Sequence, residues 1–157
     1  MLKKFLGIMI VVLLIIVVSL FIYSKGISSN VTGSLEDIMT KVYQGINDEE
    51  LPMGLGNVEL ADDTIESFVG TSNIPYQEAI ANESMVGSIA HSVVLIRLEN
   101  ASDAELVVQE IKANVNPRKW ICVEASKVII KSKGDLVILI MGSDELAPKL
   151  EANFDDL

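Results

Sequence analysis

An uninterrupted apolar run near the N-terminus constrains this chain more than any other feature. Residues 5–24 carry no charge and are almost entirely aliphatic. About 20 helical residues, rising about 1.5 Å each, match the roughly 30 Å hydrocarbon core of a bilayer. Lipid offers the backbone no hydrogen-bond partners, so the run should be helical. Lys3 and Lys4 precede the run and Lys25 follows it. By the positive-inside rule, we predict a single-pass transmembrane helix with a cytoplasmic N-terminus.

A cleaved signal peptide is the alternative interpretation of the same run. Signal peptides have a shorter apolar region, of about 7 to 15 residues, that ends at a small-x-small cleavage site. Here the run is longer and residues 21–28 make a poor site, although residues 26–29 leave cleavage open. We therefore predict that residues 1–25 are an uncleaved signal anchor. Residues 26–33 would form a juxtamembrane linker, and residues 34–157 a folded domain. In either case the domain is expected outside the cytoplasm, and the uncleaved anchor would hold it at the cell membrane.

The composition of residues 26–157 narrows the chemistry of this outer part. All 22 acidic residues but only nine of the 12 basic ones fall there, a formal balance of −13. Such a surface repels phosphates, so we expect no binding to nucleic acid. The chain has one cysteine and one histidine, which leaves no disulfide framework and no motif that needs two histidines or several cysteines. We expect no metal and no cofactor.

Hydrophobic periodicity is clearest in the second half of the chain. A strand is predicted over 92–99, an amphipathic helix over 103–115, and a hairpin of two strands over 126–131 and 135–141. A last helix follows from Ser143. This strand-helix-strand-strand-helix order predicts an α+β fold, with a transmembrane helix followed by a small α/β sandwich. If strand 92–99 pairs in parallel with a later strand across the helix, that crossover should be right-handed.

The first half of the domain is less informative. Apolar residues on one stripe and a capping box at Ser34 predict a helix over 34–46. Residues 48–57 contain one proline and two glycines and are predicted to form a loop. The pattern over 64–70 fits a helix or a strand, and we favour a short helix.

A pair formed by Cys122 and His91 is the one candidate for nucleophile and base. A reactive thiolate needs exposure and a neighbouring cation, histidine or helix N-terminus. Cys122 lies in an apolar, strand-like context, and His91 precedes a strand. We therefore favour a buried structural cysteine and a surface or capping histidine. Pairs of carboxylates could serve a hydrolase, but among 22 acidic residues chance pairs are too common to identify one. We expect no catalytic residues.

A basic region on this acidic domain is the one candidate binding patch. Its residues are Arg118, Lys119, Trp120, Lys127, Lys131 and Lys133. Such a patch could contact anionic lipid headgroups, phosphates of a wall polymer or an acidic protein. The simpler interpretation is that lysines protect the edge of a sheet against aggregation, and we prefer it. Trp120 is either a recognition anchor or part of the core, and the core is favoured.

Several segments resemble a known family. They are residues 88–97, the stretch Pro-Arg-Lys-Trp-Ile-Cys-Val at 117–123, Lys-Val at 127–128, and Lys-Gly-Asp before the apolar strand at 133–141. These resemble a bacterial family of small membrane-anchored or secreted proteins classed as domain of unknown function family 4358. The resemblance implies a bacterial protein of the envelope and supplies no activity, cofactor or site residue.

Three functional hypotheses follow for the outer domain. The leading one is a membrane-anchored envelope protein whose acidic domain binds a protein or a cell-wall component without catalysis. The second is a small envelope enzyme that depends on a thiol or on carboxylates. The third is a protein secreted after signal cleavage.

Overall fold

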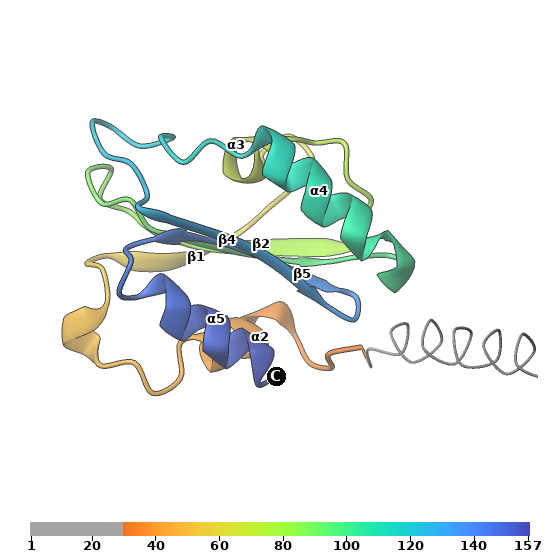
Figure 1. The fold of residues 1–157 in the computed structure, drawn as a ribbon, viewed down its shortest axis with the longest axis horizontal. Helices are drawn as coiled ribbons and strands as arrows, with labels where there is room; N and C mark the ends of the chain where they lie inside the picture. The colour runs from red at the N-terminus through yellow and green to blue at the C-terminus, as the bar shows by residue number, and fades with distance from the viewer. Residues whose placement is uncertain (1–29) are drawn as a thin grey trace, which may run out of the picture.

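The computed structural model describes residues 30–157, which form a five-stranded sheet with helices on both faces (Figure 1). The strands are β1 (Leu55–Glu59), β2 (Glu78–Ser84), β3 (Ser92–Arg97), β4 (Lys127–Lys133) and β5 (Leu136–Gly142). The helices are α2 (Leu35–Val42), α3 (Ile65–Val69), α4 (Ala104–Asn114) and α5 (Ala147–Asp155), with single 3₁₀ turns η1 (Asp48–Glu50) and η2 (Ala101–Asp103).

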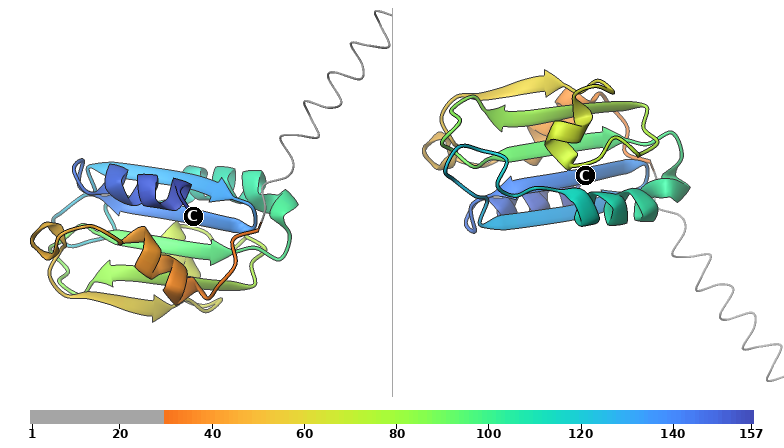
Figure 2. Two further views of the ribbon diagram at one scale, coloured as in Figure 1. Left: turned by 90° about the horizontal axis from the view of Figure 1, so that it is seen from below. Right: turned by 90° about the horizontal axis from the view of Figure 1, so that it is seen from above.

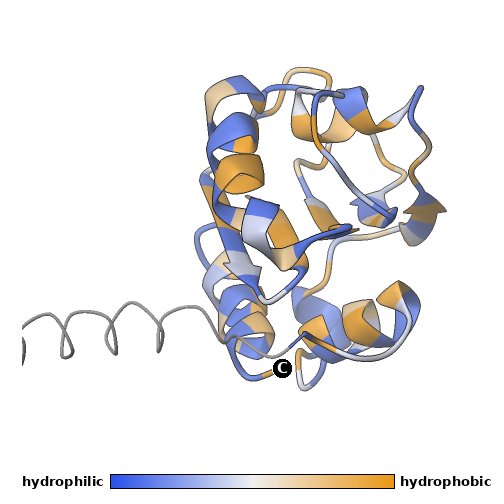
Figure 3. Ribbon diagram, turned by 90° about the vertical axis from the view of Figure 1, so that its right-hand side faces the viewer, coloured by the Kyte–Doolittle hydropathy of each residue, from blue (hydrophilic) through white to orange (hydrophobic). Residues whose placement is uncertain are grey.

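The sheet lies between two helical layers. Helices α2 and α5 cover one face, and α3 and α4 cover the other (Figure 1). Along β3, Val93 and Leu95 pack toward α2 and α5, while Val94 and Ile96 pack toward α3 and α4. All seven residues of β5 are buried, because a strand covered on both faces needs apolar side chains at every position. The helices carry bands of apolar and polar residues, as amphipathic helices do (Figure 3).

The predicted fold class is wrong in its arrangement, although the α+β class is confirmed. The strand order is β1-β2-β3-β5-β4 and every neighbouring pair is antiparallel. The crossover through α4 therefore does not place β3 beside β4, because the tight hairpin inserts β5 between them. Among the helices of residues 30–157, none has the length and hydrophobicity that crossing a bilayer requires. The predicted transmembrane segment, residues 5–24, lies outside the described residues.

Two strands were missed in the first half of the domain. β1 occupies part of the segment predicted as a loop, and β2 lies where no strand was predicted. Their sequences, Leu-Gly-Asn-Val-Glu and Glu-Ala-Ile-Ala-Asn-Glu-Ser, contain few large apolar residues. Both strands are stabilised by pairing with a neighbouring strand. β2 pairs with the buried β3, and β1 pairs only with β2. The short helix favoured over 64–70 is confirmed by α3.

One end of the sheet holds the start of the described chain. The Arg97 guanidinium donates to the backbone oxygens of Val31 and Gly33, at 2.9 and 2.8 Å. The same guanidinium pairs with Glu78 at 2.7 Å and with Asp135 at 3.2 Å. We call this the Arg97 end of the sheet. The loops at 52–54, 85–90 and 115–125 lie at the opposite end (Figure 1), which we call the loop end.

Candidate functional site

The six residues of the predicted basic patch lie in two groups on opposite faces of the sheet. Lys119 and Trp120 lie on the α4 face, where Lys119 Nζ is 3.1 Å from a carboxylate oxygen of Glu83. Trp120 Nε1 donates to the same carboxylate at 2.8 Å, and Lys119 also lies over the Phe68 ring. Burial lowers the pKa of Lys119. Arg118 is exposed, 3.6 Å from Glu124.

The other three residues of the patch lie on the edge strand β4. Lys131 Nζ is 2.6 Å from Asp155 and 3.1 Å from Glu151, both on α5, and the hydrogen bond to Asp155 raises the pKa of Lys131. Lys133 Nζ donates to the backbone oxygen of Asp155 at 2.6 Å, while Lys127 is exposed. Lys131 and Lys133, both on β4, therefore contact the same helix, α5. Lys119 lies on the opposite face of the sheet. Ligand binding by these six residues stays a prediction.

The expectations for Cys122 and His91 are reversed. Cys122 is exposed, at a φ of 61° in the 115–125 loop, because the segment is not a strand. His91 is 1 % exposed, with Nε2 2.7 Å from the Tyr43 hydroxyl and with a buried Nδ1 that has no hydrogen-bond partner. Burial lowers the pKa of His91 to about 4 and raises that of Tyr43. The His91 ring is therefore neutral at pH 7 and out of reach of a substrate.

The loop end of the sheet exposes large apolar side chains. Met53, Met85 and Ile121 are each about three-quarters exposed, at 75 %, 76 % and 74 %. Backbone hydrogen bonds join their loops: Met85 N donates to Gly54 at 2.9 Å, and Ile121 N donates to Gly87 at 3.1 Å. No sequence pattern groups these three residues, because they come from three separate loops.

The two edges of the sheet differ in chemistry. β4 carries four polar residues, three of them lysines, whereas β1 contains neither lysine nor proline. At the two ends of β1, Met85 N donates to Gly54 O and Leu60 N donates to Ala79 O, both at 2.9 Å. Antiparallel pairing alternates, so the intervening Leu55, Asn57 and Glu59 direct their backbone N–H and C=O groups outward. No strand within residues 30–157 pairs with that side, and Figure 2 shows β1, in yellow, along the margin of the sheet.

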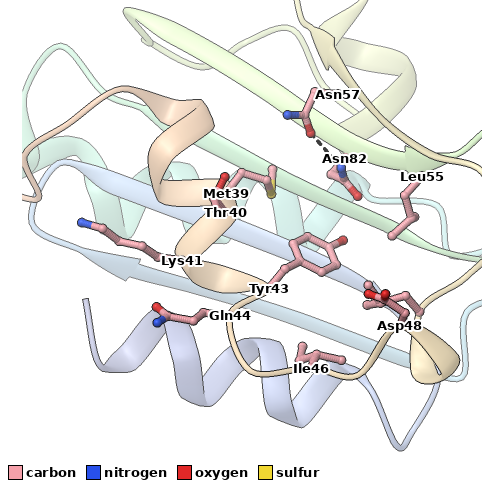
Figure 4. Close-up of a pocket in the computed structure, with 11 residues that line it drawn as sticks. Met39, Thr40, Lys41, Tyr43, Gln44, Ile46, Asp48, Leu55, Asn57 and Asn82 are labelled. Carbon is pink, nitrogen blue, oxygen red and sulfur yellow. Dashed lines mark hydrogen bonds between the residues drawn. The ribbon is translucent and has the colours of Figure 1, made fainter.

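A first cavity lies beside the start of β1, between the sheet and α2 (Figure 4). We call it the Tyr43 pocket, and its volume is about 660 Å³. Met39 and Leu55 contribute apolar surface, and Asn57 and Asn82 contribute amides that hydrogen-bond to each other at 2.7 Å. The Oδ1 atom of Asn82 is buried and has no hydrogen-bond partner. The pocket therefore offers an apolar wall beside amide groups.

A second cavity lies beside the end of β1, at the start of α2. We call it the Glu59 pocket, and its volume is about 560 Å³. Glu36, Glu59, Asp62 and Glu78 all line it. The Tyr76 hydroxyl donates to Asp62 at 2.6 Å, and desolvation together with that carboxylate raises the pKa of Tyr76 to about 12. Within the described part of the chain, no three His, Cys, Asp or Glu side chains are grouped to hold a metal ion.

Comparisons with known proteins add no assignment. The chain matches no protein-family model, no curated protein and no solved structure. The resemblance to domain of unknown function family 4358 therefore stays a prediction. The site rests on the geometry of β1 and its two pockets, which sequence reasoning missed because β1 was predicted as a loop.

Proposed function

We propose that this chain is a non-catalytic envelope protein whose outer domain binds an extended polypeptide segment along the outer edge of β1. One observation carries the proposal: β1 is an open sheet edge with a pocket beside each of its ends. Unpaired backbone donors and acceptors on an edge strand bind a further strand through main-chain hydrogen bonds, and neighbouring pockets select its side chains.

The opposite edge of the sheet supports this interpretation by contrast. Lys131 and Lys133 on β4 are held by α5, and charged side chains on an edge strand discourage pairing with another strand. β1 has no lysine or proline, and none of its five residues is buried, whereas Ile129 of β4 is buried. A sheet with one open edge strand and one edge strand protected by lysines is suited to pairing with a partner at the open edge alone.

The cellular setting is part of the same proposal. The apolar residues 5–24 and the lysines that flank them are the features by which a chain is held in a membrane with its C-terminal part outside the cytoplasm. Protease added to intact cells should then degrade residues 30–157. Protection in intact cells, together with loss after permeabilisation, would place the domain in the cytoplasm and contradict the envelope role.

Site-specific photo-crosslinking tests the binding proposal in native cells. A photoreactive phenylalanine analogue replaces Asn57 on the outer edge of β1, and a matched control replaces Gln109, which is exposed on α4. We expect a discrete crosslinked polypeptide from position 57 that is missing from position 109, with the partner peptide identified by mass spectrometry. Identical crosslinking patterns from the two positions would refute binding at β1.

A further inference from the structure

We infer that the β1 edge selects an antiparallel strand that carries a basic residue followed, four residues later, by a large apolar residue. The inference rests on the proposed function and specifies its ligand. It follows from three observations: the side of the sheet that each β1 side chain faces, the chemistry of the two pockets, and the direction of the existing strands.

The register between β1 and β2 shows on which face of the sheet each β1 side chain lies. Leu55, Asn57 and Glu59 pair with Ser84, Asn82 and Ile80, and Ile80 packs in the cluster formed with α2 and α5. The three β1 side chains therefore lie on the α2 face. Residues directly opposite each other on neighbouring strands share a face. Residues of an added strand that lie opposite these three would accordingly point toward the groove beside α2.

The carboxylates of the Glu59 pocket favour a basic residue in the added strand. Glu78 is already paired with Arg97 at 2.7 Å. Within residues 30–157, Glu36, Glu59 and Asp62 form no ion pair with a lysine or arginine. A lysine or arginine opposite Glu59 would enter a pocket lined by these carboxylates. The chain as a whole has a formal charge of −10, which adds a long-range attraction for a basic segment.

The Tyr43 pocket supplies the requirement for an apolar residue. It borders Leu55 and Asn57, and its volume of about 660 Å³ accommodates the largest side chains. Met39 and Leu51 also contribute to its apolar wall. A large apolar side chain opposite Leu55 would bury surface there. Strand residues rise by about 3.3 Å, so positions opposite Leu55 and Glu59 are about 13 Å apart.

The orientation of the added strand follows from the sheet. All four strand pairings formed by residues 30–157 are antiparallel, and antiparallel pairing is slightly more stable per residue. The residue opposite Glu59 then precedes the residue opposite Leu55, which places the basic residue first.

A second copy of this chain is a poorer occupant of the same edge. In a two-fold antiparallel pairing centred on Asn57, the second copy's Glu59 would face the Tyr43 pocket. The second copy's Leu55 would face the Glu59 pocket. A carboxylate would then enter the apolar pocket, and an apolar side chain would enter the acidic pocket. Two chains that each carry a charge of −10 also repel each other.

Two synthetic peptides of equal composition test the inference. The first contains Lys-Thr-Val-Thr-Phe and the second Phe-Thr-Val-Thr-Lys, each flanked by serines, capped at both ends and labelled with a fluorophore. Binding to the full-length chain in detergent micelles is measured by fluorescence polarisation. We expect the peptide with lysine first to bind at least tenfold more tightly. In hydrogen-exchange NMR, the amides of Leu55, Asn57 and Glu59 should become protected when it binds.

Matched variants separate the edge from the pocket chemistry. Asn57→Pro removes an outward N–H, whereas Asn57→Ala removes the side chain and keeps that donor. Glu59→Lys reverses a charge in the pocket, and Asp144→Lys makes the same change at an exposed position outside it. We expect Asn57→Pro and Glu59→Lys each to weaken binding at least tenfold relative to their controls. Circular dichroism confirms that each variant is folded.

The outcomes distinguish the two levels of the proposal. If Asn57→Pro abolishes binding but the two peptides bind equally and Glu59→Lys has no effect, edge pairing stands and the selectivity inferred here is refuted. Tighter binding of the peptide with phenylalanine first would refute the antiparallel register. If Asn57→Pro binds as Asn57→Ala does, edge pairing is refuted, and the proposed function with it. Protection of the three amides that rises with protein concentration and needs no peptide would assign the edge to a second copy instead.

Discussion

Lowering the pH from 8 to 5 should destabilise this protein through His91. Its ring is 1 % exposed, Nε2 contacts the Tyr43 hydroxyl and Nδ1 has no partner, so protonation would bury a charge with an unpaired donor. Burial lowers the pKa of His91 to about 4, from an ordinary value of 6.5. The unfolded chain therefore binds the proton more tightly, and stability falls as the pH drops from 6.5 toward 4. These two pKa values predict that the free energy of unfolding is about 2 kcal/mol lower at pH 5 than at pH 8.

Urea unfolding of the wild type and of His91→Gln measures this loss. The variant is expected to be less stable at pH 8, because glutamine must fit a buried site shaped around an imidazole ring. The carboxylates titrate in both proteins, so their contribution cancels when the change between pH 8 and pH 5 is compared. We expect the wild type to lose about 2 kcal/mol more than the variant over this range. Equal changes in the two proteins would refute the assignment to His91.

Three further substitutions have expected outcomes. Gly70 ends α3 at a φ of 86°, and a Cβ there would overlap the Asn114 carbonyl oxygen, so Gly70→Ala should cost about 2–4 kcal/mol in urea unfolding; a loss below about 0.5 kcal/mol would contradict this packing. Arg97→Met removes the donors to Val31 and Gly33, so limited proteolysis should cut residues 30–34 faster, and an unchanged rate would count against the contact. Cys122→Gly should stabilise the protein by about 1 kcal/mol, because glycine adopts the positive φ of 61° without strain; destabilisation would show that the thiol makes contacts in the native fold.

The second half of the fold was predictable from the sequence because burial imposes strong patterns there. β3 and β5 lie in the middle of the sheet, and their near-continuous apolar sequences are those of strands covered on both faces. α4 carries its buried Val107 and Ile111 four residues apart, which is the spacing of one helical face. The hairpin turn was recognisable from Gly134, which adopts a positive φ of 59°.

The candidate site was not predictable, for a related physical reason. An edge strand such as β1 is half solvated, so its five residues show no apolar alternation, and Gly54 and Gly56 suggest a loop. The two pockets depend on how α2 packs against residues about 20 to 40 positions away in the chain, which no local pattern encodes. Cys122 misled the prediction because the residues around it are apolar, although the backbone there turns through a left-handed conformation.

The Arg97 contacts determine how a mechanical load would enter the domain. A pull on residue 30 would pass through the carbonyls of Val31 and Gly33 to a guanidinium on β3, the central strand of five. The load would therefore enter the sheet at its middle strand and not at its margin. β1 is two places from that strand, so the candidate binding edge lies away from the point where the load enters.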